Sequence, residues 1–62
     1  MNWEEKVKKE RQQLIKKIYK LDEFLKGPID STISDYQIRL LTIQLHTMRA
    51  YADILTARLE EM

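Results

Sequence analysis

Basic and aromatic side chains recur at helical spacing in the first half of this sequence, and their chemistry is that of ligand binding. Lysine and arginine neutralise phosphates, and tyrosine rings stack on bases. On a helix that turns by about 100° per residue, one flank collects a mixed set of such residues: Lys8, Arg11, Ile15, Tyr19 and Lys26. The set indicates a surface for a phosphorylated, aromatic ligand; a solvated lysine-rich face is the alternative interpretation.

A second polar line runs through the other half of the chain. Gln37, Gln44, Tyr51 and Arg58 share one side of a helix, squeezed between two apolar stripes. Such a narrow line cannot face open water along its whole length, so we expect it at the rim of a contact between subunits. Tyr51 and Arg58 are therefore candidate ligand contacts. The alternative is a Tyr51 ring that is buried in the fold with its hydroxyl satisfied there.

Residues for catalysis are scarce. His46 is the single histidine, cysteine is absent, and the one glycine excludes a glycine-rich phosphate loop. No inward Glu-x-x-His pattern for a di-metal carboxylate site occurs. We expect His46 on a solvent face together with other polar residues of its helix: Thr42, Arg49, Asp53 and Thr56. The sequence thus predicts a protein that is not an enzyme, with no catalytic residue, no metal site and no cofactor.

Length and charge limit the classes of protein to which this chain can belong. Sixty-two residues with a net charge of +1 form at most one small domain, and the charge balance does not call for nucleic acid. No apolar run reaches the length of a membrane span, and the charged start from Glu4 lacks the apolar core of a signal peptide. We expect one domain over residues 1–62, with no membrane partner and a cytoplasmic location.

Two helices, over residues 3–26 and 35–60, must position these side chains. Asn2 caps the first, whose apolar face comprises Trp3, Val7, Leu14, Ile18, Leu21 and Leu25. Gly27-Pro28 ends it, because glycine suits the left-handed residue after a helix and proline cannot continue one. Ser34, with Gln37 three residues later, caps the second helix. The short connector predicts an all-α, antiparallel two-helix hairpin.

The second helix has more apolar surface than the first can cover. Its inner stripe comprises Ile38, Leu41, Leu45, Met48, Ala52, Leu55, Leu59 and Met62. A second stripe, roughly 140° away, comprises Leu40, Ile43, Thr47, Ala50, Ile54 and Ala57. A chain this small, without disulfides, typically gains stability by oligomerisation. We therefore predict a homo-oligomeric helical bundle that associates through the second stripe.

Arg11 interrupts the apolar face of the first helix between Val7 and Leu14. One interpretation is that its charged end extends to solvent while its stem stays against the seam between the helices. The other is that its charge is directed into a polar pocket at a junction between subunits. Both remain open at the level of the sequence.

The second helix also resembles a known group of proteins. The run Leu41-Thr42, Gln44-Leu45, Met48, Ala50-Tyr51-Ala52, Ile54-Leu55 and Ala57-Arg58, after a Leu14–Leu25 helix and a proline turn, resembles bacteriophage helical hairpins related to the anti-CBASS and anti-Thoeris sponges. The resemblance implies oligomers that sequester, without turnover, cyclic nucleotide signals of bacterial immunity inside an infected host. The implied ligand is a cyclic di- or trinucleotide or a cyclic ADP-ribose-type molecule, held between protomers.

The candidate ligand contacts follow from these two arguments together. In those sponges an aromatic binding residue lies in an extra N-terminal segment; this sequence departs from them by starting almost directly in its first helix, and Trp3 is the candidate stacking residue in its place. The full candidate set is Trp3, Lys8, Arg11, Tyr19, Tyr51 and Arg58. The alternative is a small structural or regulatory four-helix bundle, a dimer of hairpins that uses the lysines of its first helix to bind RNA, or that binds another protein.

Overall fold

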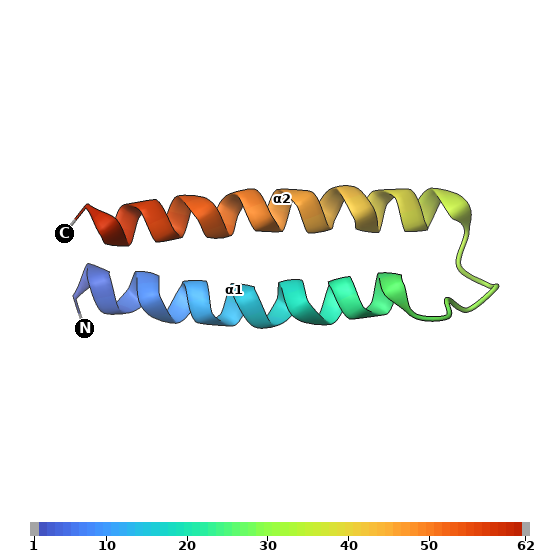
Figure 1. Cartoon of the computed structure of the whole chain (residues 1–62), viewed down its shortest axis with the longest axis horizontal. Coiled ribbons are helices and arrows are strands. Elements are labelled where there is room, and N and C mark those ends of the chain that lie inside the picture. Colours follow the sequence, from blue (N-terminus) through green and yellow to red (C-terminus); the bar gives the residue numbers. More distant parts are fainter. Residues whose placement is uncertain (1, 62) are drawn as a thin grey trace.

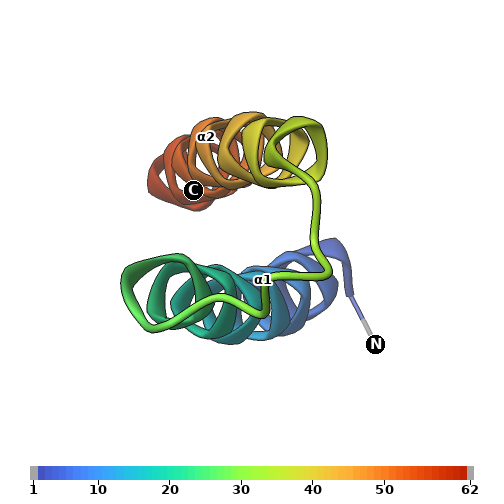
Figure 2. The ribbon, with the colours of Figure 1, turned by 90° about the vertical axis from the view of Figure 1, so that its right-hand side faces the viewer.

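The computed structural model describes residues 2–61 and contains two helices, α1 (Trp3–Lys26) and α2 (Asp35–Glu60). The helices run antiparallel, with both chain ends at the same end of a rod of 46 × 15 × 15 Å (Figure 1). Seen end-on, they face each other along one seam, and each helix turns its other side outward (Figure 2). The predicted all-α hairpin and both helix ranges are confirmed, and residues 2–61 contain no strand.

Both predicted N-caps form. The Asn2 side chain accepts a hydrogen bond of 2.9 Å from the Glu5 amide, and the Ser34 hydroxyl accepts one of 3.1 Å from the Gln37 amide. Each cap satisfies a backbone donor that the first turn of a helix leaves without a partner. The chain therefore enters each helix at the residue that the sequence indicates.

The end of α1 differs from the prediction. Gly27 has extended backbone angles, φ −88° and ψ −177°, and no residue of 2–61 adopts a positive φ. The left-handed glycine that we expected is wrong, because Pro28 restricts the residue before it to extended conformations. The Gly27 amide still closes the helix by donating to the Glu23 carbonyl at 3.1 Å.

A short polar turn then directs the chain back. The Asp30 carboxylate accepts hydrogen bonds from the amide and the hydroxyl of Thr32, at 2.8 and 2.9 Å. These two bonds hold the pKa of Asp30 below its usual value of 3.8. The turn closes with the Ile33 amide donating to the Asp30 carbonyl at 3.0 Å, one residue before the Ser34 cap.

The core lies along the seam and is tightest in the half that holds the chain ends. Its buried members come from both predicted apolar faces: Val7, Leu14, Leu45, Ala52 and Leu55. Ile18, Met48 and Leu59 pack around it, whereas Leu21, Leu25, Ile38 and Leu41 near the turn are half-buried. The expected contribution of Met62 lies outside the described residues.

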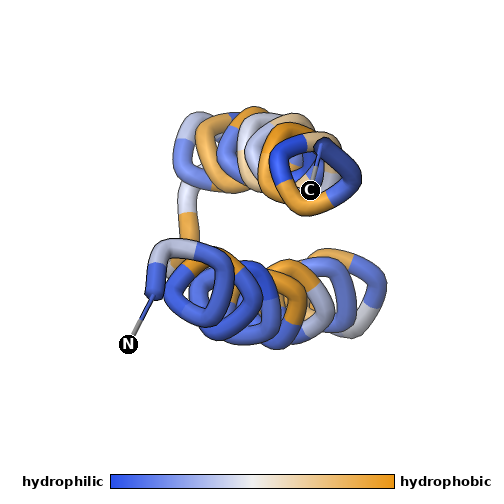
Figure 3. Tube along the Cα trace, turned by 90° about the vertical axis from the view of Figure 1, so that its left-hand side faces the viewer, coloured by the Kyte–Doolittle hydropathy of each residue, from blue (hydrophilic) through white to orange (hydrophobic). Residues whose placement is uncertain are grey.

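The second apolar stripe of α2 stays uncovered by its own chain. All six of its residues are exposed, Ile43 to 54% and Ile54 to 56%. Hydrophobic positions accordingly occur on more than one side of α2, whereas the outward side of α1 is mainly hydrophilic (Figure 3). We call this surface the outer stripe; it comprises Leu40, Ile43, Thr47, Ala50, Ile54 and Ala57. Neither α1 nor α2 is long and apolar enough to cross a bilayer.

Candidate functional site

The hairpin divides the six candidate ligand contacts between the two flanks of the seam. Lys8, Arg11 and Tyr19 follow one another at spacings that place them on one side of α1, which we call the Arg11 flank. Tyr51 and Arg58, two turns apart on α2, lie with Trp3 on the opposite side, the Tyr51 flank. One hairpin therefore does not bring the six residues into a single site.

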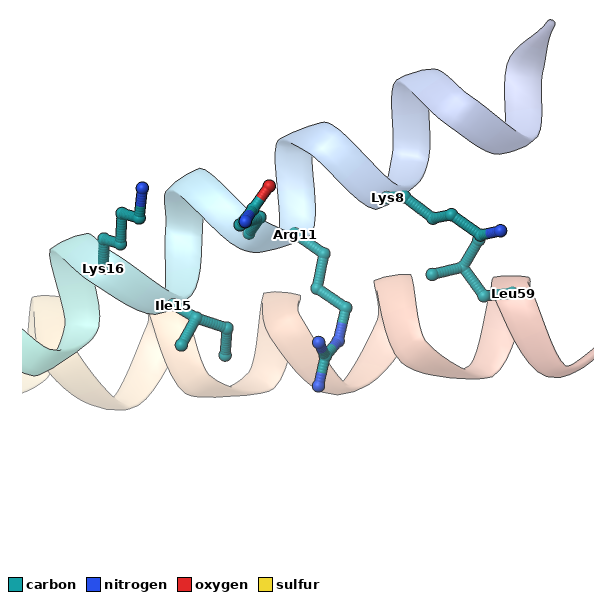
Figure 4. A pocket seen from close by; sticks show the side chains of 6 residues that line it. Lys8, Arg11, Ile15, Lys16 and Leu59 are labelled. Atoms are coloured by element: carbon teal, nitrogen blue, oxygen red, sulfur yellow. The ribbon is translucent and has the colours of Figure 1, made fainter.

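The Arg11 flank contains a groove of about 490 Å³. Side chains of α1 form most of its wall, and Leu59 of α2 closes one end (Figure 4). Its lining residues are Lys8, Arg11, Gln12, Ile15, Lys16 and Leu59. Ile15 and Leu59 contribute apolar side chains on either side of Arg11 (Figure 4). This is the composition of a site for a ligand with both apolar and anionic parts.

Arg11 crosses the seam instead of leaving it. Its Nε–H donates to the Thr56 hydroxyl at 2.7 Å, and Thr56 donates onward to the Ala52 carbonyl at 3.0 Å. The half-buried Arg11 thus extends from α1 to α2 within one hairpin (Figure 4). Thr56 on the facing helix therefore holds Nε at the seam, whereas the terminal N–H groups of Arg11 make no hydrogen bond within residues 2–61.

The Arg11 groove is cationic. Three of its lining residues, Lys8, Arg11 and Lys16, are basic, and none is acidic. The ion pairs among residues 2–61 both involve Asp22, with Lys26 at 2.9 Å and Arg49 at 3.1 Å. The three basic groups of the groove consequently have no carboxylate partner in the described hairpin. Such groups are available to neutralise a phosphate.

Tyr19 extends the Arg11 flank beyond the groove. It lies one helical turn after Ile15, and its side chain is 67% exposed. An exposed tyrosine beside a cationic groove offers a ring on which a base can stack. Lys26, which the sequence placed on the same flank, is instead paired with Asp22.

On the Tyr51 flank the tyrosine is already engaged. Its hydroxyl donates a hydrogen bond to the Glu10 carboxylate on α1. This bond is the largest cause of a raised Tyr51 pKa, since it holds the proton on the phenol, and desolvation adds to it. The alternative interpretation is thus confirmed for the Tyr51 hydroxyl and wrong for the ring, because Tyr51 is 40% exposed.

Trp3 and Arg58 meet near the chain ends. Together with Glu61 they line a shallow hollow of about 330 Å³, and the indole is half exposed. The Glu61 carboxylate opposes the Arg58 charge there, so the hollow attracts an anion less strongly than the Arg11 groove does. Aromatic stacking is the contribution that Trp3 offers at this end.

A family model described as Sequestin matches residues 1–61. The chain belongs to the Sequestin family. The family name fits a sequestering protein, in agreement with the function that the resemblance to phage sponges implies. No curated protein and no solved structure matches the chain significantly.

The solvent face that we predicted around His46 is only partly present in this member of the Sequestin family. His46 is exposed, but Arg49 bridges to Asp22 on α1, and Thr56 is half-buried at Arg11. The pKa of Asp22 falls below 3.8, mainly through its hydrogen bond with Lys26 and further through Arg49. Two of the residues expected in solvent therefore fasten α2 to α1.

Sequence reasoning missed Gln12, Lys16, Leu59 and Thr56 as parts of the Arg11 flank. The helical spacing groups Thr56 with Arg49, but by itself it led us to expect both on a solvent face and gave no sign that Thr56 meets Arg11. Within residues 2–61 no three acidic or histidine side chains come together in a way that would hold a metal ion.

Proposed function

We propose that this protein is a phage anti-defence sponge that binds and sequesters a cyclic oligonucleotide or related nucleotide second messenger of bacterial immunity. Membership of the Sequestin family supports a sequestering role. The observation that carries the choice of ligand is the lining of the Arg11 groove, which combines three basic side chains with Ile15 and Leu59 and contains no acidic residue. The protein would act in the cytoplasm of an infected bacterium.

The groove supplies the two kinds of contact that a nucleotide needs. Lys8 and Lys16 present ammonium groups to phosphates, and Arg11 keeps its terminal N–H groups for a ligand because its bond to Thr56 uses Nε. Ile15 and the exposed Tyr19 ring face the sugar or base. None of these groups activates a nucleophile, so the bound ligand is held and released unchanged.

A second copy of the chain would complete the site. Self-association through the outer stripe places Tyr51 and Arg58, which border that stripe, at the rim of the contact between protomers. Trp3 shares a hollow with Arg58 and would lie nearby. The two flanks of the seam then offer contacts of two kinds, phosphate neutralisation on the Arg11 flank and aromatic stacking on the Tyr51 flank.

Calorimetry with a panel of cyclic dinucleotides, cyclic trinucleotides and cyclic ADP-ribose isomers tests the proposal. We expect saturable binding of at least one ligand, which chromatography recovers intact after the protein is denatured. No heat from any member of the panel, with protein that is folded by circular dichroism, would contradict the proposal. Conversion of the ligand would contradict the absence of catalysis.

Two neighbouring lysines provide a matched pair of variants. Lys8 lines the Arg11 groove, whereas Lys9 is exposed on the outward side of α1. Lys8→Glu should weaken binding about tenfold or more, because it replaces a phosphate contact by a repulsive charge. Lys9→Glu makes the same change in net charge and should leave the affinity within about twofold at moderate salt. Equal losses would show that binding depends only on overall charge.

A second candidate function rests on the outward side of α1. Lys9 and Lys20 are exposed there, and Lys16, which also lines the Arg11 groove, continues this basic row. Such a row would suit an RNA backbone in a four-helix bundle made of two hairpins. Binding to an RNA hairpin that weakens steeply with salt, together with silence toward the nucleotide panel, would favour this function.

A further inference from the structure

Two rows of residues border the outer stripe along the length of α2. Each row repeats once every two turns, the spacing of positions beside a coiled-coil seam. One row comprises Arg39, His46, Asp53 and Glu60, and the other comprises Gln37, Gln44, Tyr51 and Arg58. All eight side chains are exposed. The first row carries positive charge toward the start of α2 and negative charge toward its end, and this polarity restricts what can pack on the stripe.

We propose that a second copy of the chain covers the outer stripe with its own outer stripe, the two α2 helices running antiparallel about a two-fold axis midway between residues 48 and 49. The proposal rests on the self-association in the proposed function and adds its direction and register. It makes the assembly a four-helix bundle whose centre is formed by α2 and whose outside is formed by α1.

The sizes of the stripe residues favour this register. Residues equidistant from the axis meet, so Leu40 packs on Ala57 of the partner subunit and Ile43 on the partner's Ile54. Thr47 meets the partner's Ala50, where small side chains allow close approach of the helices at the centre. A parallel pairing would set each residue against itself, so that Ala50 and Ala57 face their own copies and leave thin layers. Cores are most stable when large and small side chains interdigitate, a condition that the two Leu40–Ala57 layers meet in antiparallel pairing and that no layer meets in parallel pairing.

The charges favour the same arrangement. In antiparallel pairing like rows face each other, so Arg39 lies beside the partner's Glu60 and His46 beside the partner's Asp53, each contact occurring twice. Within residues 2–61 none of these four side chains has an ion pair or a side-chain hydrogen bond. Parallel pairing keeps one attraction, Asp53 with the partner's Arg58, and places Glu61 against its own copy.

The row of Gln37, Gln44, Tyr51 and Arg58 is compatible with antiparallel pairing. This pairing places Tyr51 beside the partner's Gln44 and Arg58 beside the partner's Gln37, with no like charges in contact. Because the Tyr51 hydroxyl is directed toward Glu10, the exposed edge of its ring remains for the partner. Both sides of the outer stripe thus accept an antiparallel copy, and the first side selects it.

A charge-swap cycle tests direction and register at once. Arg39→Glu should weaken dimerisation about tenfold, and Glu60→Arg should do the same, because each turns two attractions into repulsions. The double variant should return to within about twofold of the parent, since the pair is re-formed with its signs exchanged. Residues 39 and 60 lie about 30 Å apart along one α2, so they cannot restore each other within a chain. Sedimentation equilibrium measures each dissociation constant.

We do not expect the charge-swap variants to weaken dimerisation by unfolding the helix. A glutamate near the start of a helix and an arginine near its end both suit the helix dipole, so neither variant should unfold α2. Circular dichroism checks this. Additive losses in the double variant, or a parent chain that stays monomeric at high micromolar concentration, would overturn the proposal; in the latter case the stripe would serve another protein.

Cysteine cross-linking gives an independent result in a chain that has no native cysteine. A mixture of Ile43→Cys and Ile54→Cys chains should form the mixed disulfide. Ile43→Cys alone should not cross-link, because two copies of residue 43 would be about 16 Å apart. The opposite outcome would establish a parallel pair. Neither the charge-swap cycle nor the cross-linking uses a nucleotide, so a negative result in them does not contradict the proposed sequestering function. Conversely, an absence of nucleotide binding in calorimetry does not contradict the antiparallel dimer.

Discussion

The outward sides of α1 and α2 differ, although the two helices share one seam and have nearly the same length. Away from the seam α1 presents lysines, among them Lys9, Lys16 and Lys20. The corresponding side of α2 presents Leu40, Ile43 and Ile54. The seam needs only one apolar face from each helix, and each helix provides one with buried residues.

This difference separates two tasks within a chain of 62 residues. The exposed apolar stripe of α2 adds nothing to the hairpin that carries it, and this is why we propose it as the surface for self-association. A basic outward side keeps α1 in water. Ile54 and Leu55 are neighbours in the sequence and belong to different stripes, so single substitutions can test the division.

The largest effect is expected at the inner stripe. Leu55 is 0% exposed, and Leu55→Ala should lower the free energy of unfolding by about 2–5 kcal/mol through lost burial and a cavity. Ile54→Ala should lower it by less than about 1 kcal/mol in dilute protein, where the hairpin is separated from its copies. Chemical denaturation followed by circular dichroism compares the two. Equal losses would mean that the hairpin itself uses the outer stripe.

The outer stripe should control association instead. Ile54→Asp should weaken self-association by roughly 100-fold, because each dimer would bury two unpaired carboxylates. Helix content should persist, since residue 54 is exposed in the single hairpin. Lys9→Asp places the same residue on the outward side of α1 and should leave the mass in sedimentation unchanged. A loss of association in both variants would show that α1 also takes part.

Local signals allowed most of the fold to be predicted. The caps at Asn2 and Ser34 and the apolar spacing between them define both helices, because each signal acts within a few residues of its position. The conformation of Gly27 was predicted wrongly for a reason that is also local. Its freedom to adopt a positive φ matters less than the restriction that Pro28 imposes on it.

The candidate site was less predictable because it depends on partners across the seam. A helical wheel places Arg11 in the seam and Tyr51 beside it, but it does not specify which residue of the other helix each one meets. Thr56 and Glu10 are those partners, 45 and 41 residues away in the sequence. Finding them requires the axial register of the two helices and the side-chain rotamers, which spacing within one helix does not determine.

The Arg11–Thr56 contact should have an intermediate effect. Thr56→Val removes the acceptor of the Arg11 Nε–H at nearly constant shape and should cost about 1–2 kcal/mol of unfolding free energy. Thr42→Val is the matched control, because Thr42 is exposed and its hydroxyl bonds only to the Ile38 carbonyl of its own helix. It should change stability by less than about 0.5 kcal/mol. Similar losses would mean that Arg11 gains nothing from crossing the seam.

The smallest effect is expected at the Tyr51–Glu10 contact, on the border between the seam and the outer stripe. The bond raises the Tyr51 pKa above 10.0, so its contribution to stability is present below pH 10.0 and is lost as the pH rises through the higher folded value. Glu10→Gln should return the Tyr51 titration toward 10.0, because it removes the carboxylate that holds the proton. Ring carbon chemical shifts followed with pH, and assigned with Tyr51→Phe, measure this. An unchanged titration in Glu10→Gln would mean that desolvation, and hence the surroundings of the outer stripe, sets the Tyr51 pKa.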